Sequence, residues 1–455
     1  MKTAWICTQL LAVSSALMIF LAGPPAYGQR GAADASAEYD LLLKGAHVVD
    51  PANQIDGPMD VAISDGKIAA VEKGISGEKA RRSVEVDGLY VSPGFIDIHA
   101  HVSAGRFLAR PSHPPDMNLA SGLTTIVDAG SWGARDFHLL KRYHIDRAQI
   151  RILAFLNIAS QGMGAREDDP NEQELEYLDP ELCAETIKRY AQHIVGVKTA
   201  HYWTSKPFDE AHPPWASVER AVAAGELAGV PVMVDFWPRP PERPYPELIL
   251  EKLRPGDIHT HVFAQQFPVI DKDGKVYDHM RQARRRGIVF DLGHGAGSFW
   301  FRNAAPAIEQ GFIPDTISTD LHMRNVNGPV VDMITTMSKI MALGVPLADV
   351  IRRSTVNPAR AIGRPSLGTL GIGSEADVAV FELRRGRFGY TDCGRARMIG
   401  DVKLENRMTI RAGRVVYDPS GLSMVDWRDA PEQYFSIPKL QGISPRATAD
   451  PDYSE

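Results

Sequence analysis

The sequence predicts an α/β fold, a (β/α)₈ TIM barrel, joined to a small β-sandwich domain that is built from both ends of the chain. Three observations support this prediction. Short apolar runs alternate with helix-like segments through the middle of the chain, these runs number eight, and both flanks have a different, strand-like alternation. Apolar strands that alternate with helices indicate a parallel sheet covered on both faces. Eight such units over roughly 270 residues fit a closed barrel better than an open doubly wound sheet, which is the alternative.

The first 28 residues have the pattern of a secretory signal peptide. Lys2 precedes a long apolar stretch, and Ala26-Tyr27-Gly28 places small residues at the −3 and −1 positions of a cleavage site. An uncleaved membrane anchor is the competing interpretation, but Gly23-Pro24-Pro25 breaks the helix before it reaches a spanning length of ~20 residues. We therefore expect a signal peptide over residues 1–28, an exported (periplasmic or secreted) protein, and no membrane association after cleavage.

The flanks of the barrel predict a single β domain. Residues 39–92 and 363–420 alternate apolar with polar residues between turn signals such as Ser64-Asp65-Gly66. Residues 93–362 then form the barrel domain. Residues 426–455 have little periodicity and are expected to form a C-terminal extension.

Composition narrows the classes of partner. The chain of 455 residues has 44% apolar and 23% charged residues, as in an ordinary soluble protein. Its formal charge of −6 argues against a nucleic-acid partner, which would leave a basic footprint. Cys7 leaves with the signal peptide, and Cys183 and Cys393 belong to no CxxC motif, so we expect free, partly buried thiols and no zinc–thiolate site. Pairing of these two cysteines and homo-oligomerisation are both left open.

The eight apolar runs are the candidate barrel strands. In chain order they are residues 89–101, 122–130, 150–160, 193–200, 230–236, 256–263, 287–295 and 315–322. Helix-like segments lie between most of them, at residues 180–193, 215–229, 302–312 and 330–344.

Polar residues at the ends of these runs point to a metal site, because active sites of such barrels lie at the carboxyl ends of the strands. The first run ends in PGFIDIHAHV (93–102), where alternate residues share a face, so Asp97, His99 and His101 would line up. Five other runs also end in His, Lys or Asp. The residues concerned are Lys198, Asp235, His259 and His261, His294, and Asp320 and His322.

Each of these residues, taken alone, has an ordinary explanation. A single histidine at a strand end is more often a hydrogen-bonded core residue, and Lys198 could pair with a buried carboxylate. Asp128 and Asp235 could cap the helices that follow them. His259 lies deeper than His261 and is read as a packing or supporting residue. The coincidence of six such strand ends favours a metal site.

Several motifs resemble the amidohydrolase superfamily, within it the dihydroorotase-like branch and the bacterial amidohydrolase/deacetylase group. They are PGFIDIHAH after a β domain, the lysine of the fourth run, THVF (260–263), DLGHGAGSF (291–299), STDLH (318–322) and NPARAIG…LGTLGIGSEADVAVF (357–381). The likeness covers about residues 39–420.

The resemblance implies two divalent ions, with Zn²⁺ expected. His99, His101 and Asp320 would bind the more buried ion, His261 would bind the second, and Lys198, carboxylated by CO₂, would bridge both. The superfamily usually has a histidine at the end of the fifth strand, whereas this chain has Asp235. A carboxylate is a competent zinc ligand, so we expect Asp235 to bind the second ion; a supporting role behind the ligands is the alternative.

The implied activity is that of a metal-dependent hydrolase acting on carbon–nitrogen bonds other than peptide bonds, and on esters. Its substrate would be a small acylated carboxylic acid, cleaved by metal-activated hydroxide with Asp320 as general acid and base. Substrate contacts are expected from His294 and His322, at the ends of strands seven and eight. Arg302 and Arg324 follow shortly after and could hold a carboxylate; solvated surface arginines are the alternative for each. The alternatives are a dihydroorotase- or hydantoinase-like cyclic amide hydrolase and a non-catalytic exported barrel protein.

Overall fold

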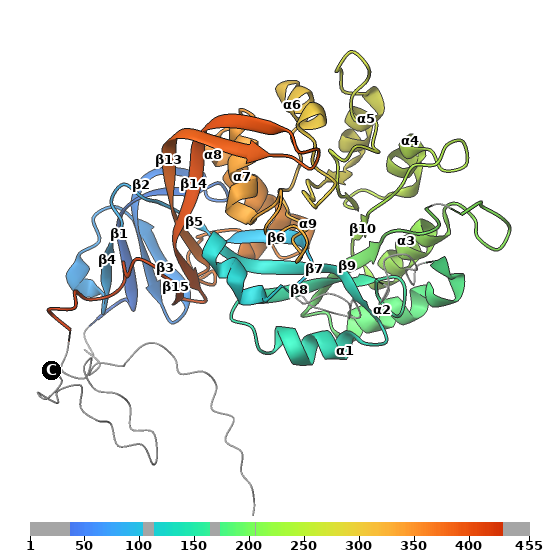
Figure 1. Ribbon diagram of the computed structural model, residues 1–455. Helices are drawn as coiled ribbons and strands as arrows, with labels where there is room; N and C mark the ends of the chain where they lie inside the picture. The colour runs from blue at the N-terminus through green and yellow to red at the C-terminus, as the bar shows by residue number, and fades with distance from the viewer. Residues whose placement is uncertain (1–36, 103–112, 164–172, 205, 431–455) are drawn as a thin grey trace, which may run out of the picture. The chain divides into compact units, whose positions relative to one another are not determined.

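The computed structural model of the chain describes residues 37–102, 113–163, 173–204 and 206–430 (Figure 1). The predicted signal peptide lies outside the described residues, as do residues 431–455 of the predicted C-terminal extension. Within the described part of the chain, no helix combines the length and the apolar character needed to cross a membrane.

Seven parallel strands form most of the barrel wall, and each pairs with its neighbour in the sequence. They carry mainly apolar, β-branched or aromatic side chains that are buried almost throughout, as a sheet covered on both faces requires. The strands are β6 (Phe95–Ala100), β7 (Leu123–Gly133), β8 (Arg151–Asn157), β9 (Ile194–Thr199), β10 (Val232–Val234), β11 (Ile258–His259) and β12 (Val289–Phe290).

Residues 315–321 take the place of the eighth strand and close the barrel. Parallel bridges join Thr316 to Asp291, beyond the end of β12, and Leu321 to Ala100 in β6. The segment is hydrogen-bonded on both sides: the amide of His294 donates to the Ser318 carbonyl at 3.2 Å, and the amide of His101 donates to the Leu321 carbonyl at 2.9 Å. The predicted (β/α)₈ barrel is therefore confirmed, with isolated bridges and backbone hydrogen bonds in place of a continuous eighth strand.

Helices lie around the outside of the strands (Figure 1). Two of them are capped at the N-terminus by the side chain of an aspartate. Asp179 accepts a hydrogen bond from the amide of Leu182, and Asp332 accepts one from the amide of Thr335. The helices are α1 (Phe137–Leu140), α2 (Pro180–Arg189), α3 (Ala216–Ala228), α4 (Tyr245–Glu247), α5 (Asp278–Arg286), α6 (Phe301–Glu309), α7 (Met333–Ala342), α8 (Leu347–Ser354) and α9 (Val356–Ala361).

The β domain combines strands from both ends of the chain, as predicted. One eight-stranded hydrogen-bonded sheet contains β1 (Leu41–Asp50), β2 (Ile55–Ser64), β3 (Lys67–Glu72), β4 (Ser83–Glu85), β5 (Tyr90–Pro93), β13 (Val378–Thr391), β14 (Arg397–Arg411) and β15 (Arg414–Tyr417). The two ends meet where β5 pairs antiparallel with β13, with Pro93 opposite Val378. Side chains from most of these strands share one apolar core.

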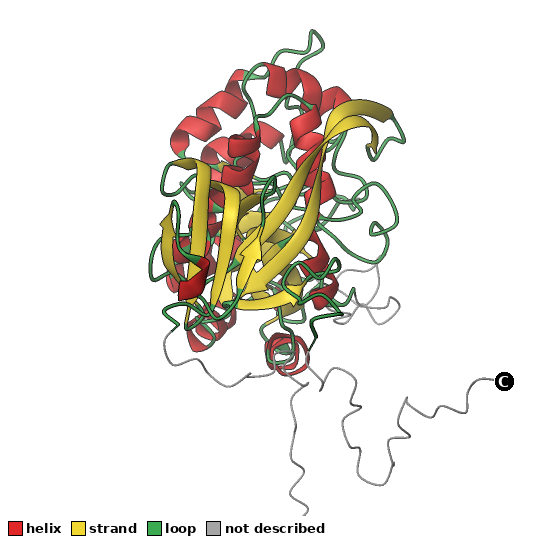
Figure 2. Cartoon of the chain, turned by 90° about the vertical axis from the view of Figure 1, so that its left-hand side faces the viewer, coloured by secondary structure: helices red, strands yellow, loops and turns green. Residues whose placement is uncertain are grey.

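The long hairpin of β13 and β14 reaches from this domain to the barrel (Figure 2). At its tip, Asp392 accepts a hydrogen bond from the amide of Phe301 at 3.1 Å, and the amide of Cys393 donates to the carbonyl of Phe299 at 3.0 Å. The thiol of Cys393 lies 3.4 Å from the carbonyl oxygen of Gly295. The hairpin tip therefore contacts the loop that follows β12. Cys183 and Cys393 are both free.

Charged side chains at the other end of the barrel also join the two parts. Arg151 at the start of β8 donates to Asp377 and to Glu375, each at 2.6 Å. Arg411 in β14 contacts the same two carboxylates. Burial by itself would raise the pKa of Glu375, but the guanidinium groups of Arg151 and Arg411 lower it below its ordinary value of 4.5.

We expect Glu375→Gln to lower stability at neutral pH, by about 1 kcal/mol at most because the carboxylate is partly exposed and screened by solvent. Because the pKa of Glu375 is lower in the folded than in the unfolded protein, its ionised carboxylate adds to the free energy of unfolding at pH values above the unfolded-state pKa. This contribution is lost as the pH falls through the folded-state pKa. The difference in unfolding midpoint between wild type and variant should therefore shrink in acid. Thermal unfolding across pH checks this, with exposed Glu78→Gln as control; a gap that stays constant through the acid range would contradict it.

Candidate metal centre

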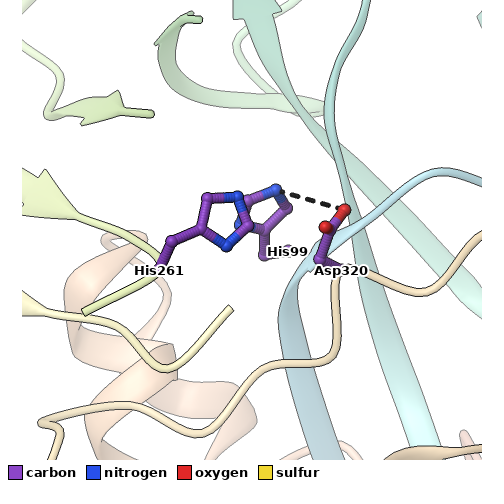
Figure 3. Close-up of side chains that lie close together, drawn as sticks. All are labelled: His99, His261 and Asp320. Atoms are coloured by element: carbon purple, nitrogen blue, oxygen red, sulfur yellow. Dashed lines mark ion pairs between the residues drawn. The ribbon is translucent and has the colours of Figure 1, made fainter. Parts of the chain in front are cut away.

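Three side chains converge at the carboxyl ends of the barrel strands. His99 comes from β6, His261 follows β11, and Asp320 comes from the closing segment (Figure 3). One ligand atom from each residue can be chosen such that all three lie within 4.8 Å of one another. His99 Nε2 lies 3.7 Å from Asp320 Oδ1. Neutral imidazoles and carboxylates are ordinary ligands of zinc, so this cluster could hold a metal ion.

His101 and Lys198 lie beside this cluster. His101 Nε2 is 3.3 Å from Asp320 Oδ1, and Lys198 Nζ is 3.2 Å from His99 Nε2. Lys198 is 1% exposed, and its stem packs so closely on Gly130 that a Cβ there would lie 2.6 Å from Lys198 Cγ. Burial and the nearby Lys198 charge lower the pKa of His99 well below its usual value, which keeps the ring in the neutral form that binds metals.

Asp235 lies beside His261. It directly follows β10, and its amide donates to the Thr199 carbonyl at 3.0 Å. Asp235 Oδ2 lies 3.4 Å from His261 Nε2. Burial alone would raise the pKa of Asp235, but the facing His261, His201 and Lys198 hold it well below its usual range. The carboxylate is therefore ionised and available to a cation.

A buried relay orients His99. The ring Nδ1 lies 2.8 Å from Thr260 Oγ1, and the Thr260 hydroxyl donates to Asp291 Oδ2 at 2.7 Å. Thr316 and Ser318 donate to the same carboxylate at 2.6 and 2.7 Å. Because the Thr260 hydrogen points at Asp291, its oxygen accepts from His99 Nδ1–H, and the lone pair of Nε2 faces the cluster.

His101 has an equivalent support. Its Nδ1 lies 2.9 Å from Ser131 Oγ, and the Ser131 hydroxyl donates to Asp128 Oδ2 at 3.0 Å. Asp128 also accepts from the amide of Val102 at 3.2 Å. Asp128 thus supports His101 through Ser131 and does not cap a helix. Both strand-one histidines therefore present Nε2 to the centre.

The predicted substrate contacts fall into two environments. The ring of His322 lies next to that of His101, with 6.4 Å between centroids, whereas Arg302 and Arg324 are exposed. His294 is fully buried: its Nδ1 lies 3.0 Å from the Gly295 carbonyl, and its Nε2 lies 2.9 Å from Lys339 Nζ. Burial and the Lys339 charge lower the pKa of His294 to about 3, so the ring is neutral. Contact of these residues with substrate stays a prediction.

His259 and Asp97 lie at strand ends but outside the ligand cluster. His259 is buried among aromatic rings, with centroids 4.6 Å from Phe267 and 5.2 Å from Tyr245, which matches its reading as a packing residue. Asp97 accepts hydrogen bonds from the hydroxyl at 2.5 Å and the amide at 3.1 Å of Thr319. It thus anchors the closing segment and does not join the ligand cluster.

Sequence reasoning missed four residues of the site: Ser131, His201, Thr260 and Asp291. Two of them stand inside motifs that were noted for other residues, Thr260 between His259 and His261, and Asp291 in DLGHGAGSF. A hydroxyl next to a strand-end histidine is the signal that could have found Thr260. His201 follows β9 by two residues and carried no strand-end signal.

Comparison of the sequence with known proteins identifies the family of the chain. A family model described as "Amidohydrolase family" matches residues 301–416. A protein named "Deacetylase" from Brucella anthropi is 34% identical over 361 residues, which cover 78% of this chain and 85% of that protein. A protein of the same name from Enterococcus faecalis is 31% identical over 386 residues, covering 84% of this chain and 100% of that protein.

Solved structures agree with these relatives. A crystal structure titled as an adenine deaminase has a TM-score of 0.74 at 30% identity and covers 84% of this chain and 100% of its own. Another, titled as a dihydroorotase, has a TM-score of 0.70 at 32% identity, covering 83% and 99%. The sequence identity, the barrel with its β domain and the clustered histidines lead to one assignment: the chain belongs to the amidohydrolase family and is a hydrolase.

Proposed function

We propose that the chain is a metal-dependent hydrolase that cleaves the amide or ester bond of a small acylated carboxylic acid. The observation that carries this proposal is the convergence of His99, His261 and Asp320 within 4.8 Å, beside buried Lys198. His99, His101, Lys198, His261, Asp235 and Asp320 would hold two divalent ions, Zn²⁺ by their ligand types, with Lys198 carboxylated on Nζ. The deacetylases among the relatives support an acyl substrate.

Bound divalent ions supply polarisation of a carbonyl and a lowered pKa for a coordinated water. The chain's own part in the reaction is to move a proton. Burial by itself would raise the pKa of Asp320, but a hydrogen bond from His101 and the charge of His261 lower it. The ionised carboxylate can therefore take the proton of the attacking water and return it to the leaving nitrogen or oxygen.

His322 is the proposed donor to the substrate. The amide of Arg324 donates to His322 Nδ1 at 3.1 Å, so the ring hydrogen of the neutral form lies on Nε2. That N–H can donate to a carbonyl or carboxylate oxygen placed beside His101. Arg302 and Arg324, whose side chains are exposed, are proposed to attract the carboxylate of the substrate.

A cyclic amide is the second candidate substrate. The similarity to the structure titled as a dihydroorotase supports it. Both candidates need the same centre, so a substrate panel must separate them. A non-catalytic barrel would bind metal and hydrolyse nothing in that panel.

Export through the first 28 residues is part of the proposal. Mature protein from the native host should begin near Gln29, after the Ala26-Tyr27-Gly28 site. N-terminal sequencing checks this, and retention of Met1 in the mature protein would refute it.

The function is tested by metal content and turnover on one sample, purified with bicarbonate and screened against acylated amino acids, acyl hydroxy acids and cyclic amides. Wild type should contain divalent ions and hydrolyse at least one class, and chelation should abolish turnover. Asp320→Asn should lower kcat by about 10²–10⁴-fold, because the proton carrier is lost. Near-normal turnover of Asp320→Asn at unchanged metal content would refute the assigned role.

The relay behind His99 gives a further test. Thr260→Val removes the acceptor of His99 Nδ1–H at constant volume, so we expect metal affinity to fall by about 10–100-fold. Thr124→Val is the matched control, since Thr124 is fully buried in β7 and its hydroxyl has no partner among the described residues. Competition with a chromogenic chelator measures the affinities; equal values for both variants would show that the relay is not needed.

A further inference from the structure

The strand-five position is where this chain departs from the pattern of its family. Asp235 stands at the end of β10, where a histidine is usual in the superfamily that the sequence resembles. An imidazole is nevertheless present near that point, because His201 Nε2 lies 3.8 Å from Asp235 Oδ2. The same carboxylate oxygen is 3.4 Å from His261 Nε2. Three potential ligands from three consecutive strand ends thus face one another.

These separations are those of ligands around a shared ion. Two atoms that each lie ~2.0–2.2 Å from zinc in tetrahedral geometry are about 3.3–3.6 Å apart. The His261–Asp235 distance falls in this range, and the His201–Asp235 distance is slightly above it. A hydrogen bond between the last two would need about 2.7–3.2 Å, so the ring of His201 is not simply bonded to the carboxylate.

The backbone of His201 has the left-handed conformation that is costly for a residue with a side chain. Its φ is 60°, close to the values of 63° at His261 and 47° at Asp320. Such residues persist where surrounding structure holds them, and they cluster at functional sites. The buried side chain of Gln173 holds this turn: it donates to the His201 carbonyl at 2.7 Å and accepts from the amide of Trp203 at 2.9 Å.

We propose that His201 supplies the imidazole ligand that the strand-five position lacks, and that His201, Asp235 and His261 together hold the second metal ion. This inference rests on the proposed metal-dependent function. The second ion would thereby keep two imidazole ligands, His201 after β9 and His261 after β11, and would have the Asp235 carboxylate in addition. The side chain of His201 is 41% exposed, against 11% for Asp235 and 6% for His261. The second ion is therefore the one nearer to solvent and the first to be lost to a chelator.

The left-handed backbone allows a clean test with His201→Gly. Glycine accepts a φ of 60° without strain, so the variant should fold as wild type does, with an unfolding midpoint of the metal-free protein no lower than that of wild type. Titration with Co²⁺ in bicarbonate buffer, followed by visible absorption and by ion content after dialysis, should show two ions per wild-type chain. His201→Gly should keep one ion tightly and bind the second more than 100-fold more weakly, beyond the ~10–100-fold cost of losing a residue that only orients a ligand.

Three comparisons decide the outcome. Free imidazole should restore the second-ion affinity of His201→Gly, and His201→Gln, which keeps a hydrogen-bond donor, should behave like His201→Gly. His212→Ala is the control on the same segment, where the ring of His212 stacks on Trp203 at 3.6 Å, and it should bind two ions as wild type does. Two ions bound by His201→Gly with unchanged affinity would overturn the inference and leave the proposed function standing. Wild type that binds no ion would instead overturn the proposed function.

Discussion

The amide of Asp320 donates a hydrogen bond to the carbonyl of His99 at 2.5 Å, and the centre depends on this contact. It joins the closing segment to the first barrel strand, so the residues at the two ends of the barrel domain become neighbours. Ring closure then brings every other strand end to the same rim, including those that carry Lys198, Asp235 and His261. An open sheet with the same strands would leave its first and last residues apart.

The sequence predicts those parts of the site that depend on local patterns of residues. A buried strand places alternate residues on one face and its last residue at the rim, so the sequence alone groups His99, His101, Lys198 and Asp320. Their convergence follows from the fold class alone. The β domain was accessible for the same reason, because its strands alternate in polarity at both ends of the chain.

Other parts depend on tertiary contacts that leave no local signal. His201 lies two residues beyond its strand, and only the left-handed turn held by Gln173 returns its ring to the rim. The relay through Thr260 and Asp291 crosses between adjacent strand ends, so neither residue alone indicates it. His294 has the sequence position of a substrate contact, yet Lys339 from α7 lies against its ring.

The pairing of Pro93 with Val378 has a consequence for how the protein is made. Nearly the whole barrel lies between these partners, so their contact closes a very long loop and forms only after both segments exist. During synthesis on a ribosome, strands β1 to β5 would emerge before β13, and β5 would expose unpaired backbone groups at its edge. Exposed strand edges favour aggregation. The proposed export, if it takes place before folding, would avoid that interval, because all eight strands of the sheet would be present before any of them has to fold.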